Sequence, residues 1–349
     1  MKSSSSAASL TEPVGIREIA RESGVSIATV SRVLQGNARV SRDLRAKVEE
    51  VVRRLNYRPN FSARTLRMQK SNTVGVVVPH IGNAHFSDAV RAIQDVASNE
   101  GYTALIVNSD GEPEQELAAL RTLQARQVDG IILVSASPTG TKALTSTIDR
   151  GVPVLAMDRA IRGASVDQVL VNTRAGTREA VLHLAGNRCS RIALLAGPSG
   201  LWTASEKFKG YLEGLKEAQL EFDPDLVLPG DYSFESGENQ ALALLDLKPR
   251  PDALIVANNL MTLGAMRVFL RQGVQIPGEL ALVGYDDALW TDVVRPTVTV
   301  VSQPTYELGA VSIRTLLARL ANRSTEPKQV VLDTRLIVRE SSARGPANP

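Results

Sequence analysis

The sequence contains little cysteine or histidine for its length: among 349 residues there is one cysteine, Cys189, and there are three histidines. A single cysteine excludes an internal disulfide and a zinc cluster built on several cysteines, and it fits a reducing compartment. No run of about 18 apolar residues occurs, so no membrane-spanning helix is predicted. The opening MKSSSSAASLTEPVG has one lysine and no apolar core, so we expect a disordered lead over 1–13 rather than a secretory signal. These features favour a cytoplasmic protein.

Motifs for catalysis and for metal binding are missing as well. The sequence contains no GxSxG, no Walker A motif and no histidine cluster with metal-ligand spacing. Asp110, Asp158 and Asp286 stand at the ends of predicted strands, but neither a nucleophile nor a metal partner accompanies these carboxylates. We therefore expect no enzyme activity, no cofactor and no metal site.

Charge is distributed unevenly along the chain. Residues 1–70 contain 14 Lys and Arg against 6 Asp and Glu, a net charge of +8, whereas the remainder contains 26 against 31, a net charge of −5. A basic module on an acidic body is typical of a nucleic-acid contact confined to one end of a protein. A solvated basic surface without such a partner would have the same charge. The length of the chain favours two or three domains.

The basic module is predicted to form three short helices. Apolar residues of IREIARESG share one helical face, and Gly24 follows where a tight turn needs a permissive backbone. Ser26 is a favourable N-cap for the next helix, IATVSRVLQG, and Ser41 for the third. Short side chains at the start of the second helix, with Arg32 beyond them, suit the major groove of DNA. The pattern predicts a helix-turn-helix domain over 14–58, although a three-helix bundle with a polar face would show the same periodicity.

The stretch LNYRPNFSARTLRM after the third helix is either a passive linker or a functional element. It has no glycine, three arginines and a leucine, Leu66, without an obvious packing partner. Together with VGIREIARESGVSIATVSRVLQGNARVS, the pieces ATVSRVL, NYRPN and ARTL at this spacing resemble the LacI/GalR family of bacterial transcription regulators. The resemblance implies a hinge helix over 59–70 that folds on DNA, with Leu66 and its dimer mate inserted into a minor-groove step. Packing of Leu66 against the body is the alternative.

The same resemblance assigns residues to DNA contact. Ile27 and Ala28 stand where family members differ in operator preference; because both are apolar, they can touch thymine methyl groups but cannot hydrogen-bond to a base. Gly15 departs from the family, which often has a threonine there that caps the first helix and contacts phosphate. The implied DNA-contacting positions are Ser26, Ile27, Ala28, Thr29, Ser31, Arg32, Tyr57, Asn60, Ala63 and Leu66.

From Thr73 onward, short runs of Val, Ile and Leu alternate with helical segments. TVGVVVP, YTALIVNSD, DGIILVS and VPVLAMD read as one series of buried strands, and RIALLAGP, LVLPGD, PDALIVANN and ELALVGYDD read as a second. Two such series predict an α/β body with two doubly wound parallel sheets, one in each lobe. Ligands bind at the carboxyl ends of such strands, so a ligand cleft is expected between the lobes.

The family resemblance extends over this body to about residue 340, through pieces such as VDGIILVS, RIALLAGP and LALVGYDD. It implies a body over 71–340 similar to periplasmic sugar-binding proteins, followed by a tail over 341–349. The expected lobes are a first over about 71–170 and 304–322, and a second over about 171–300 and 323–340.

Effector positions carried over from the family suit a polyol. Carboxylate and amide groups pair with neighbouring hydroxyl groups, and an aromatic ring can stack on an apolar sugar face. Two positions depart from the family: Lys207, where arginine is common, and Asn259, where aspartate is common. Arg159 together with Lys207 also suits a sugar acid or a sugar phosphate. The implied effector residues are His85, Phe86, Arg159, Lys207, Tyr232, Asn258 and Asp286.

These inferences together predict a repressor of a carbohydrate-utilisation operon that binds a pseudo-palindromic operator on double-stranded DNA and is switched by a small sugar-like effector. The chain ends in VRESSARGPANP, without the leucine heptads of the family's tetramers, which favours a homodimer. Two alternatives stay open: a sugar or sugar-acid sensor whose basic module binds DNA only nonspecifically, and a regulator with a purine-type corepressor. The sequence does not decide between inducer and corepressor.

Overall fold

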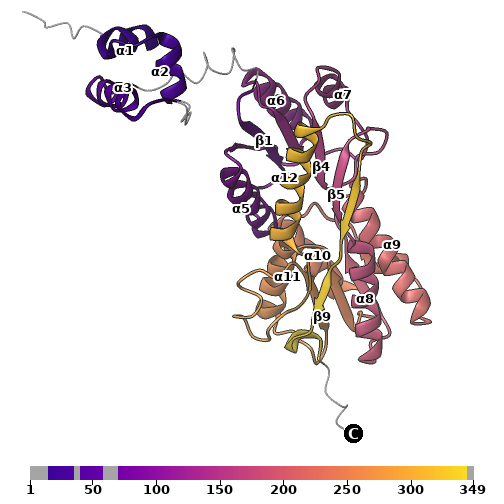
Figure 1. The fold of residues 1–349 in the computed structure, drawn as a ribbon. Coiled ribbons are helices and arrows are strands. Elements are labelled where there is room, and N and C mark those ends of the chain that lie inside the picture. Colours follow the sequence, from indigo (N-terminus) through magenta and orange to yellow (C-terminus); the bar gives the residue numbers. More distant parts are fainter. Residues whose placement is uncertain (1–14, 35–39, 58–69, 344–349) are drawn as a thin grey trace, which may run out of the picture. The chain divides into compact units, whose positions relative to one another are not determined.

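The computed structural model describes residues 15–34, 40–57 and 70–343. The chain divides into two compact units, Met1–Ser71 and Asn72–Pro349, whose elements are labelled in Figure 1. The division falls beside residue 70, where the composition changes from basic to acidic. Each unit therefore has its own charge as well as its own core.

The first unit contains three helices around a small apolar core. They are α1 (Ile16–Ser23), α2 (Ile27–Leu34) and α3 (Arg42–Arg54). The buried members of the core are Ile19, Ala20, Val30, Val33, Val48 and Val51. Since each helix contributes two of these side chains, all three helices are needed to cover the core.

The turn between α1 and α2 forms as the sequence predicts. Gly24 ends α1 in the left-handed conformation, with φ of 67°, which glycine adopts without a steric penalty. Ser26 caps α2, because its Oγ accepts a hydrogen bond from the backbone N–H of Thr29 at 3.1 Å. The predicted cap at Ser41 is wrong: this residue precedes α3, but its side chain makes no capping hydrogen bond.

The first lobe of the second unit is a six-stranded parallel sheet in the order β11-β5-β4-β3-β1-β2. Its strands are β1 (Thr73–Val78), β2 (Thr103–Asn108), β3 (Gly130–Leu133), β4 (Val154–Asp158), β5 (Asp167–Val171) and β11 (Gln329–Leu332). One face packs against α5 (Ala84–Asn99) and α12 (Thr305–Ala321). The other packs against α6 (Pro113–Ala125) and α7 (Lys142–Asp149).

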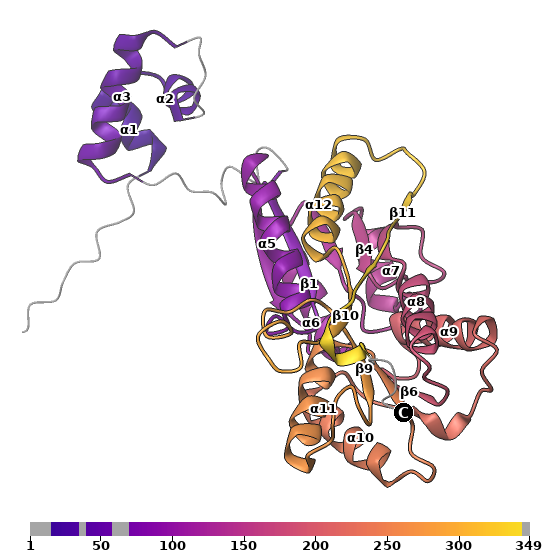
Figure 2. The ribbon, with the colours of Figure 1, turned by 90° about the horizontal axis from the view of Figure 1, so that it is seen from below.

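The second lobe repeats this plan, with the strand order β12-β10-β9-β8-β6-β7. Its strands are β6 (Ile192–Leu195), β7 (Val227–Leu228), β8 (Ala253–Val256), β9 (Ala281–Tyr285), β10 (Thr299–Ser302) and β12 (Arg335–Ile337). The helices α8 (Thr173–Gly186) and α9 (Trp202–Glu217) pack on one face. On the other lie α10 (Phe234–Asp246) and α11 (Asn259–Gln272), as Figure 2 shows. Only the edge pair β10–β12 is antiparallel.

The chain crosses between the lobes three times: after β5, after β10 and between β11 and β12. The third crossing corrects one predicted boundary. Residues 323–340 were expected in the second lobe, but β11 joins the first sheet, where Val330 pairs with Val169. The reason is that β5 would otherwise leave an open edge, which β11 covers. Only the part after the crossing at residues 333–334, which begins with β12, belongs to the second lobe.

The predicted tail over 341–349 begins too early. Ser341 and Ser342 are fully buried. The Ser341 hydroxyl donates to the carbonyl of Leu282 at 2.7 Å, and the Ser342 hydroxyl lies 2.6 Å from that of Thr299. These hydrogen bonds tie the end of the described chain to β9 and β10, so the body includes both serines.

Candidate nucleic-acid interface and interlobe cavity

In the first unit, the start of α2 presents a surface that the core does not use. Val30 and Val33 turn into the core, whereas Ile27, Ala28 and Arg32 are exposed. Ile27 is 44% exposed although its side chain is large and apolar. The arrangement leaves this end of α2 available to a partner, as a recognition helix requires.

The other predicted DNA-contacting residues of this unit fall into three groups. Ser26 is exposed and Thr29 and Ser31 are partly exposed, all near the start of α2. Tyr57 is half-buried and packs against the core. The remaining three lie outside the described residues, so their roles stay predictions: Asn60, Ala63 and Leu66.

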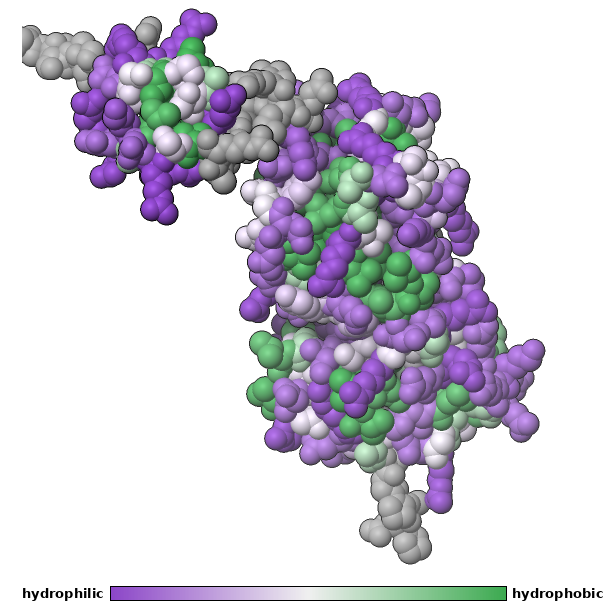
Figure 3. Space-filling view, viewed as in Figure 1, coloured by the Kyte–Doolittle hydropathy of each residue, from purple (hydrophilic) through white to green (hydrophobic). Residues whose placement is uncertain are grey.

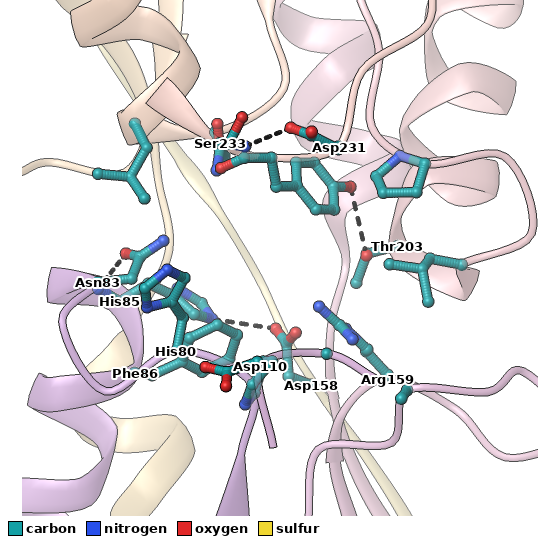
Figure 4. A pocket seen from close by; sticks show the side chains of 18 of the residues that line it. His80, Asn83, His85, Phe86, Asp110, Asp158, Arg159, Thr203, Asp231 and Ser233 are labelled. Carbon is teal, nitrogen blue, oxygen red and sulfur yellow. Dashed lines mark hydrogen bonds and ion pairs between the residues drawn. The ribbon is translucent and has the colours of Figure 1, made fainter. Parts of the chain in front are cut away.

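A cavity of about 690 Å³ lies between the two lobes, at the carboxyl ends of strands from both sheets (Figure 4). This volume is typical of a small-molecule site. All seven predicted effector residues line it: His85, Phe86 and Arg159 from the first lobe, and Lys207, Tyr232, Asn258 and Asp286 from the second. The geometry thus brings all seven predicted residues to one space.

At the floor of the cavity a histidine lies between two carboxylates. His85 Nε2 is 3.1 Å from Asp158 Oδ1 at the end of β4, and His85 Nδ1 is 3.4 Å from Asp286 Oδ1 at the end of β9. All three side chains are buried. Asp158 belongs to the first lobe and Asp286 to the second, so His85 joins the lobes.

Burial and charge oppose each other in this trio. Burial disfavours the charged imidazole, but Asp158 and then Asp286 outweigh it and raise the pKa of His85 to about 10. Burial likewise disfavours the Asp286 carboxylate, but His85 outweighs it and lowers the pKa of Asp286 to about 2. The pKa of Asp158 is also lowered, because His85 outweighs the effect of burial. An imidazolium between two carboxylates is therefore the form expected at neutral pH.

Two amides complete the bridge between the lobes. Asn259 Nδ2 donates to Asn83 Oδ1 of the first lobe and to Asp286 Oδ2 of the second, both at 2.9 Å. Gln303, at the second crossing, donates to Asp286 Oδ1 at 2.6 Å. An aspartate at position 259, as is common in the family, would lack these N–H donors and would repel Asp286. The departure at Asn259 thus has a structural role.

Lys207 is held as a buried cation in the second lobe. Its Nζ donates to the carbonyl of Ala257 at 2.6 Å and lies 4.0 Å from the centroid of the Tyr285 ring and 5.6 Å from that of Tyr232. Aromatic faces attract cations. An ammonium group has three donors, so Lys207 retains hydrogen-bonding capacity toward the cavity.

Two more of the predicted effector residues, Asn258 and Phe86, are also engaged within the protein. Asn258 caps α11, accepting from the backbone N–H of Met261 at 2.9 Å and donating to the carbonyl of Tyr232 at 2.8 Å. Phe86 is largely buried in the first-lobe core, and its ring lies edge-on to that of His85 at 4.8 Å. Both present only part of their surface to the cavity.

The polar residues at the cavity that were not among the predicted effector residues include Asn83, Asp158 and Gln303, which belong to the network around His85 and Asp286. Each ends a strand, directly follows one or directly precedes a helix in the sequence. That position could have indicated Asn83, whose Oδ1 caps α5, but not the partners of Gln303, which lie far away in sequence. Among the residues that the structure describes, no group of three or more His, Cys, Asp or Glu is placed to hold a metal ion.

Comparisons with known proteins agree with both parts of the architecture. Residues 15–60 match the model of bacterial regulatory proteins of the lacI family, and residues 181–342 match the periplasmic binding protein-like domain. Over 330 residues the chain is 32% identical to the ribose operon repressor of Halalkalibacterium halodurans, covering 95% of this chain and 97% of that protein. Over 331 residues it is 34% identical to catabolite control protein A of Priestia megaterium, covering 94% and 99%.

Solved structures give the same result. The structure of the Lac repressor dimer bound to operator and the anti-inducer ONPF matches with a TM-score of 0.85 at 29% identity, covering 95% of this chain and 100% of that one. The chain therefore belongs to the LacI family of bacterial transcription regulators. This confirms the predicted family and the predicted fold class, a helix-turn-helix domain followed by a two-lobed body. No helix within the described ranges is long and apolar enough to cross a membrane.

Proposed function

We propose that the protein is a cytoplasmic repressor of a sugar-utilisation operon, which binds a pseudo-palindromic operator as a homodimer and responds to a small sugar-like effector in the interlobe cavity. The single observation that supports this most is the cavity itself. Its walls combine polar and aromatic side chains of both lobes, in a chain whose other unit is a basic helix-turn-helix domain. A binding site joined to a DNA-binding unit is the arrangement that a ligand-controlled regulator needs.

Operator recognition is assigned to α2 and to the segment after α3. Arg32 can contact a guanine with a bidentate hydrogen bond, and Ile27 and Ala28 can contact thymine methyl groups. The net charge of +8 over residues 1–70 favours phosphate binding at any sequence. Base contacts by α2 would supply the preference for one operator.

Dimerisation is supported by apolar side chains on the surface of the body. Leu289 is 94% exposed and Val293 is 74% exposed. Figure 3 shows hydrophobic side chains over α12 and, lower in the view, at the edge beside α11. Exposed apolar patches mark interaction sites on soluble proteins, and a pseudo-palindromic operator requires two DNA-binding units related by a two-fold axis.

The switch would act through closure of the lobes. A ligand that touches both walls of the cavity favours the closed arrangement, and it can shift DNA affinity only by its differential affinity for the two states. Release of DNA makes the ligand an inducer, and tighter binding of DNA makes it a corepressor.

The proposal is tested by selecting fragments of sheared host genomic DNA with the purified protein and sequencing them. The selection is run alone, with a pool of sugars and sugar acids, and with purine bases. Enrichment of one short pseudo-palindrome is expected, and a condition that changes the enrichment identifies the ligand class. Binding without enrichment under every condition would leave a nonspecific DNA-binding sensor instead.

A further inference from the structure

The side chain of Arg159 has too few partners for its degree of burial. It follows β4, lines the cavity and is only 6% exposed; Figure 4 shows it pointing into the cavity beside Asp158 and toward Thr203. Among the described residues it has one hydrogen-bond acceptor, the carbonyl of Ser135, 3.0 Å from Nη1. Its Nε is buried without a partner. A guanidinium has five N–H donors, so most of them lack an acceptor.

Two other arginines show how this chain satisfies a guanidinium away from water. Arg319 binds both oxygens of Asp167 at 2.8 Å and the carbonyl of Glu326 at 3.0 Å. Arg339 binds Asp287 at 2.7 Å, a carbonyl and a hydroxyl. Their side chains are 14% and 17% exposed. Arg159 is more buried than either, yet it makes fewer hydrogen bonds and no ion pair within the described residues.

The charges that face the cavity from buried positions do not balance. Three are cationic and two are anionic: His85, Arg159 and Lys207 against Asp158 and Asp286. His85 contacts both carboxylates directly, so the positive charge left over belongs to Arg159 and Lys207. The acidic groups at the mouth are exposed and therefore screened by water and salt; they are Asp110, Glu112 and Asp231.

One further carboxylate lies behind Arg159, outside the cavity lining. Glu116 of α6 is 1% exposed, accepts from the Ser135 hydroxyl at 3.1 Å and accepts from the backbone N–H of Ala136 at 2.6 Å. Burial raises the pKa of this carboxyl. Its two hydrogen bonds fix the turn that presents the Ser135 carbonyl to Arg159. Glu116 thus positions the acceptor of Arg159 through the turn. The charge of Arg159 also opposes the rise in the pKa of Glu116, although no ion pair joins the two side chains.

From this geometry we infer that the effector carries an oxyanion that Arg159 binds, and that Glu116 is a positioning residue for Arg159. The oxyanion is the carboxylate of a sugar acid or the phosphate of a sugar phosphate, both of which match the planar fork of a guanidinium. Lys207 on the opposite lobe supplies the second positive charge. This inference rests on the proposed effector role of the cavity.

Calorimetric titration of the full chain tests the inference with sugars matched in skeleton. The panel contains glucose with glucuronate, gluconate and glucose 6-phosphate, galactose with galacturonate, and ribose with ribose 5-phosphate. At least one anion is expected to bind about tenfold or more tightly than its neutral parent, the difference typical of a hydrogen-bonded charge pair. Carboxylate and phosphate arms separate the two sources of the oxyanion.

Variants then connect the preference to Arg159. Arg159→Gln should weaken binding of the anion about 10- to 100-fold and should leave a neutral parent within about threefold. Arg162→Gln, a nearby exposed arginine outside the lining, should change neither. Glu116→Ala should reduce the preference for the anion over its neutral parent. Glu116→Gln, which keeps a hydrogen-bond acceptor at this position, should retain the wild-type preference. Melting curves identify any variant that fails to fold, and Glu116→Gln keeps the test informative in that case.

Two results would overturn the inference: no anion of the panel binds better than its neutral parent, or the preference persists in Arg159→Gln. In the first case the proposed function stays intact if a neutral sugar binds the cavity and changes operator affinity. Failure of the proposed function is separate, because it appears as the absence of an enriched operator.

Discussion

His85 Nδ1, on the first lobe, lies 3.4 Å from the carboxylate of Asp286, on the second lobe. The same imidazole contacts Asp158 of its own lobe, and Asn259 links Asn83 to Asp286 alongside it. These contacts hold the lobes together around the floor of the cavity through protein groups alone. A ligand that binds in the cavity would add its contacts to this bridge between the lobes. The stronger the bridge is, the less the closed arrangement of the lobes depends on the ligand.

The first prediction concerns the pH dependence of this bridge. The pKa of His85 is raised from 6.5 to about 10 in the folded protein, so the folded state retains a proton that the unfolded state loses above pH 6.5. The contribution of His85 to stability is therefore fully present below pH 6.5 and is lost as the pH rises to about 10. We expect His85→Gln to lower the free energy of unfolding by about 3–5 kcal/mol near pH 6.5, the cost of breaking a buried charge pair.

Urea unfolding of wild type and His85→Gln between pH 6.5 and 10.5 checks this prediction. The difference in free energy between the two proteins should shrink steadily across the window. A difference that stays constant to pH 10.5 would mean that His85 is neutral when folded.

The second prediction concerns the departure from the family at Asn259. Asn259→Asp removes two hydrogen bonds, adds a negative charge beside Asp286 and should lower the free energy of unfolding by about 2–4 kcal/mol at pH 7. Because the new carboxyl is less repelled when protonated, the loss should become smaller as the pH falls from 7 to 5. Asn99→Asp, at an exposed position, is the control. Equal effects of both substitutions would contradict the bridging role.

Sequence reasoning found the strands and the cavity residues for identifiable reasons. Runs such as TVGVVV and ALIV are apolar on both faces because each sheet is covered by helices on both sides. The effector positions came from the family resemblance, which placed seven residues that line one cavity.

The missed features depend on contacts that no local pattern encodes. The segment KQVVLDTRLIV reads as one strand, but the chain changes sheets at residues 333–334, and only the open edge of β5 explains this. Glu116 lies in the helical run PEQELAAL, where a glutamate is usually exposed, yet it is buried against the Ser135 turn. The bridge from His85 to Asp286 joins residues that are distant in sequence.

The third prediction concerns base recognition by α2. Arg32 is exposed near the end of this helix, and Arg32→Ala should weaken operator binding by about 1–3 kcal/mol and relax one base position in each half-site. Selection from a randomised operator library, with Arg126→Ala of the body as the control, measures both effects. An unchanged base preference in Arg32→Ala would show that this arginine contacts phosphate only.

The fourth prediction concerns the segment after α3, which lies outside the described residues. By its resemblance to the family hinge, Leu66→Ala should weaken operator binding far more than binding to nonspecific DNA, because insertion at the operator centre would be lost. Fluorescence anisotropy on both DNAs at the same salt concentration measures the ratio. Equal losses on the two DNAs would favour packing of Leu66 against the body.

The fifth prediction concerns assembly. Leu289→Asp should convert the dimer to monomers while changing the free energy of unfolding of the monomer by no more than about 0.5 kcal/mol, since the side chain is 94% exposed. Leu242→Asp, at another exposed leucine, should leave the dimer intact. Sedimentation velocity distinguishes the two. A dimer that persists in Leu289→Asp would place the interface elsewhere.

The central claim is that the cavity and the DNA-binding unit are coupled. The most direct test is to titrate the selected operator with wild-type protein in the presence of each sugar, sugar acid and sugar phosphate that binds the protein. A ligand that occupies the cavity should change operator affinity about tenfold or more, in the range typical of allosteric coupling. If a ligand occupies the cavity, as judged by loss of its binding in Asp286→Ala, and operator affinity stays the same, the cavity does not control DNA binding and the account is contradicted.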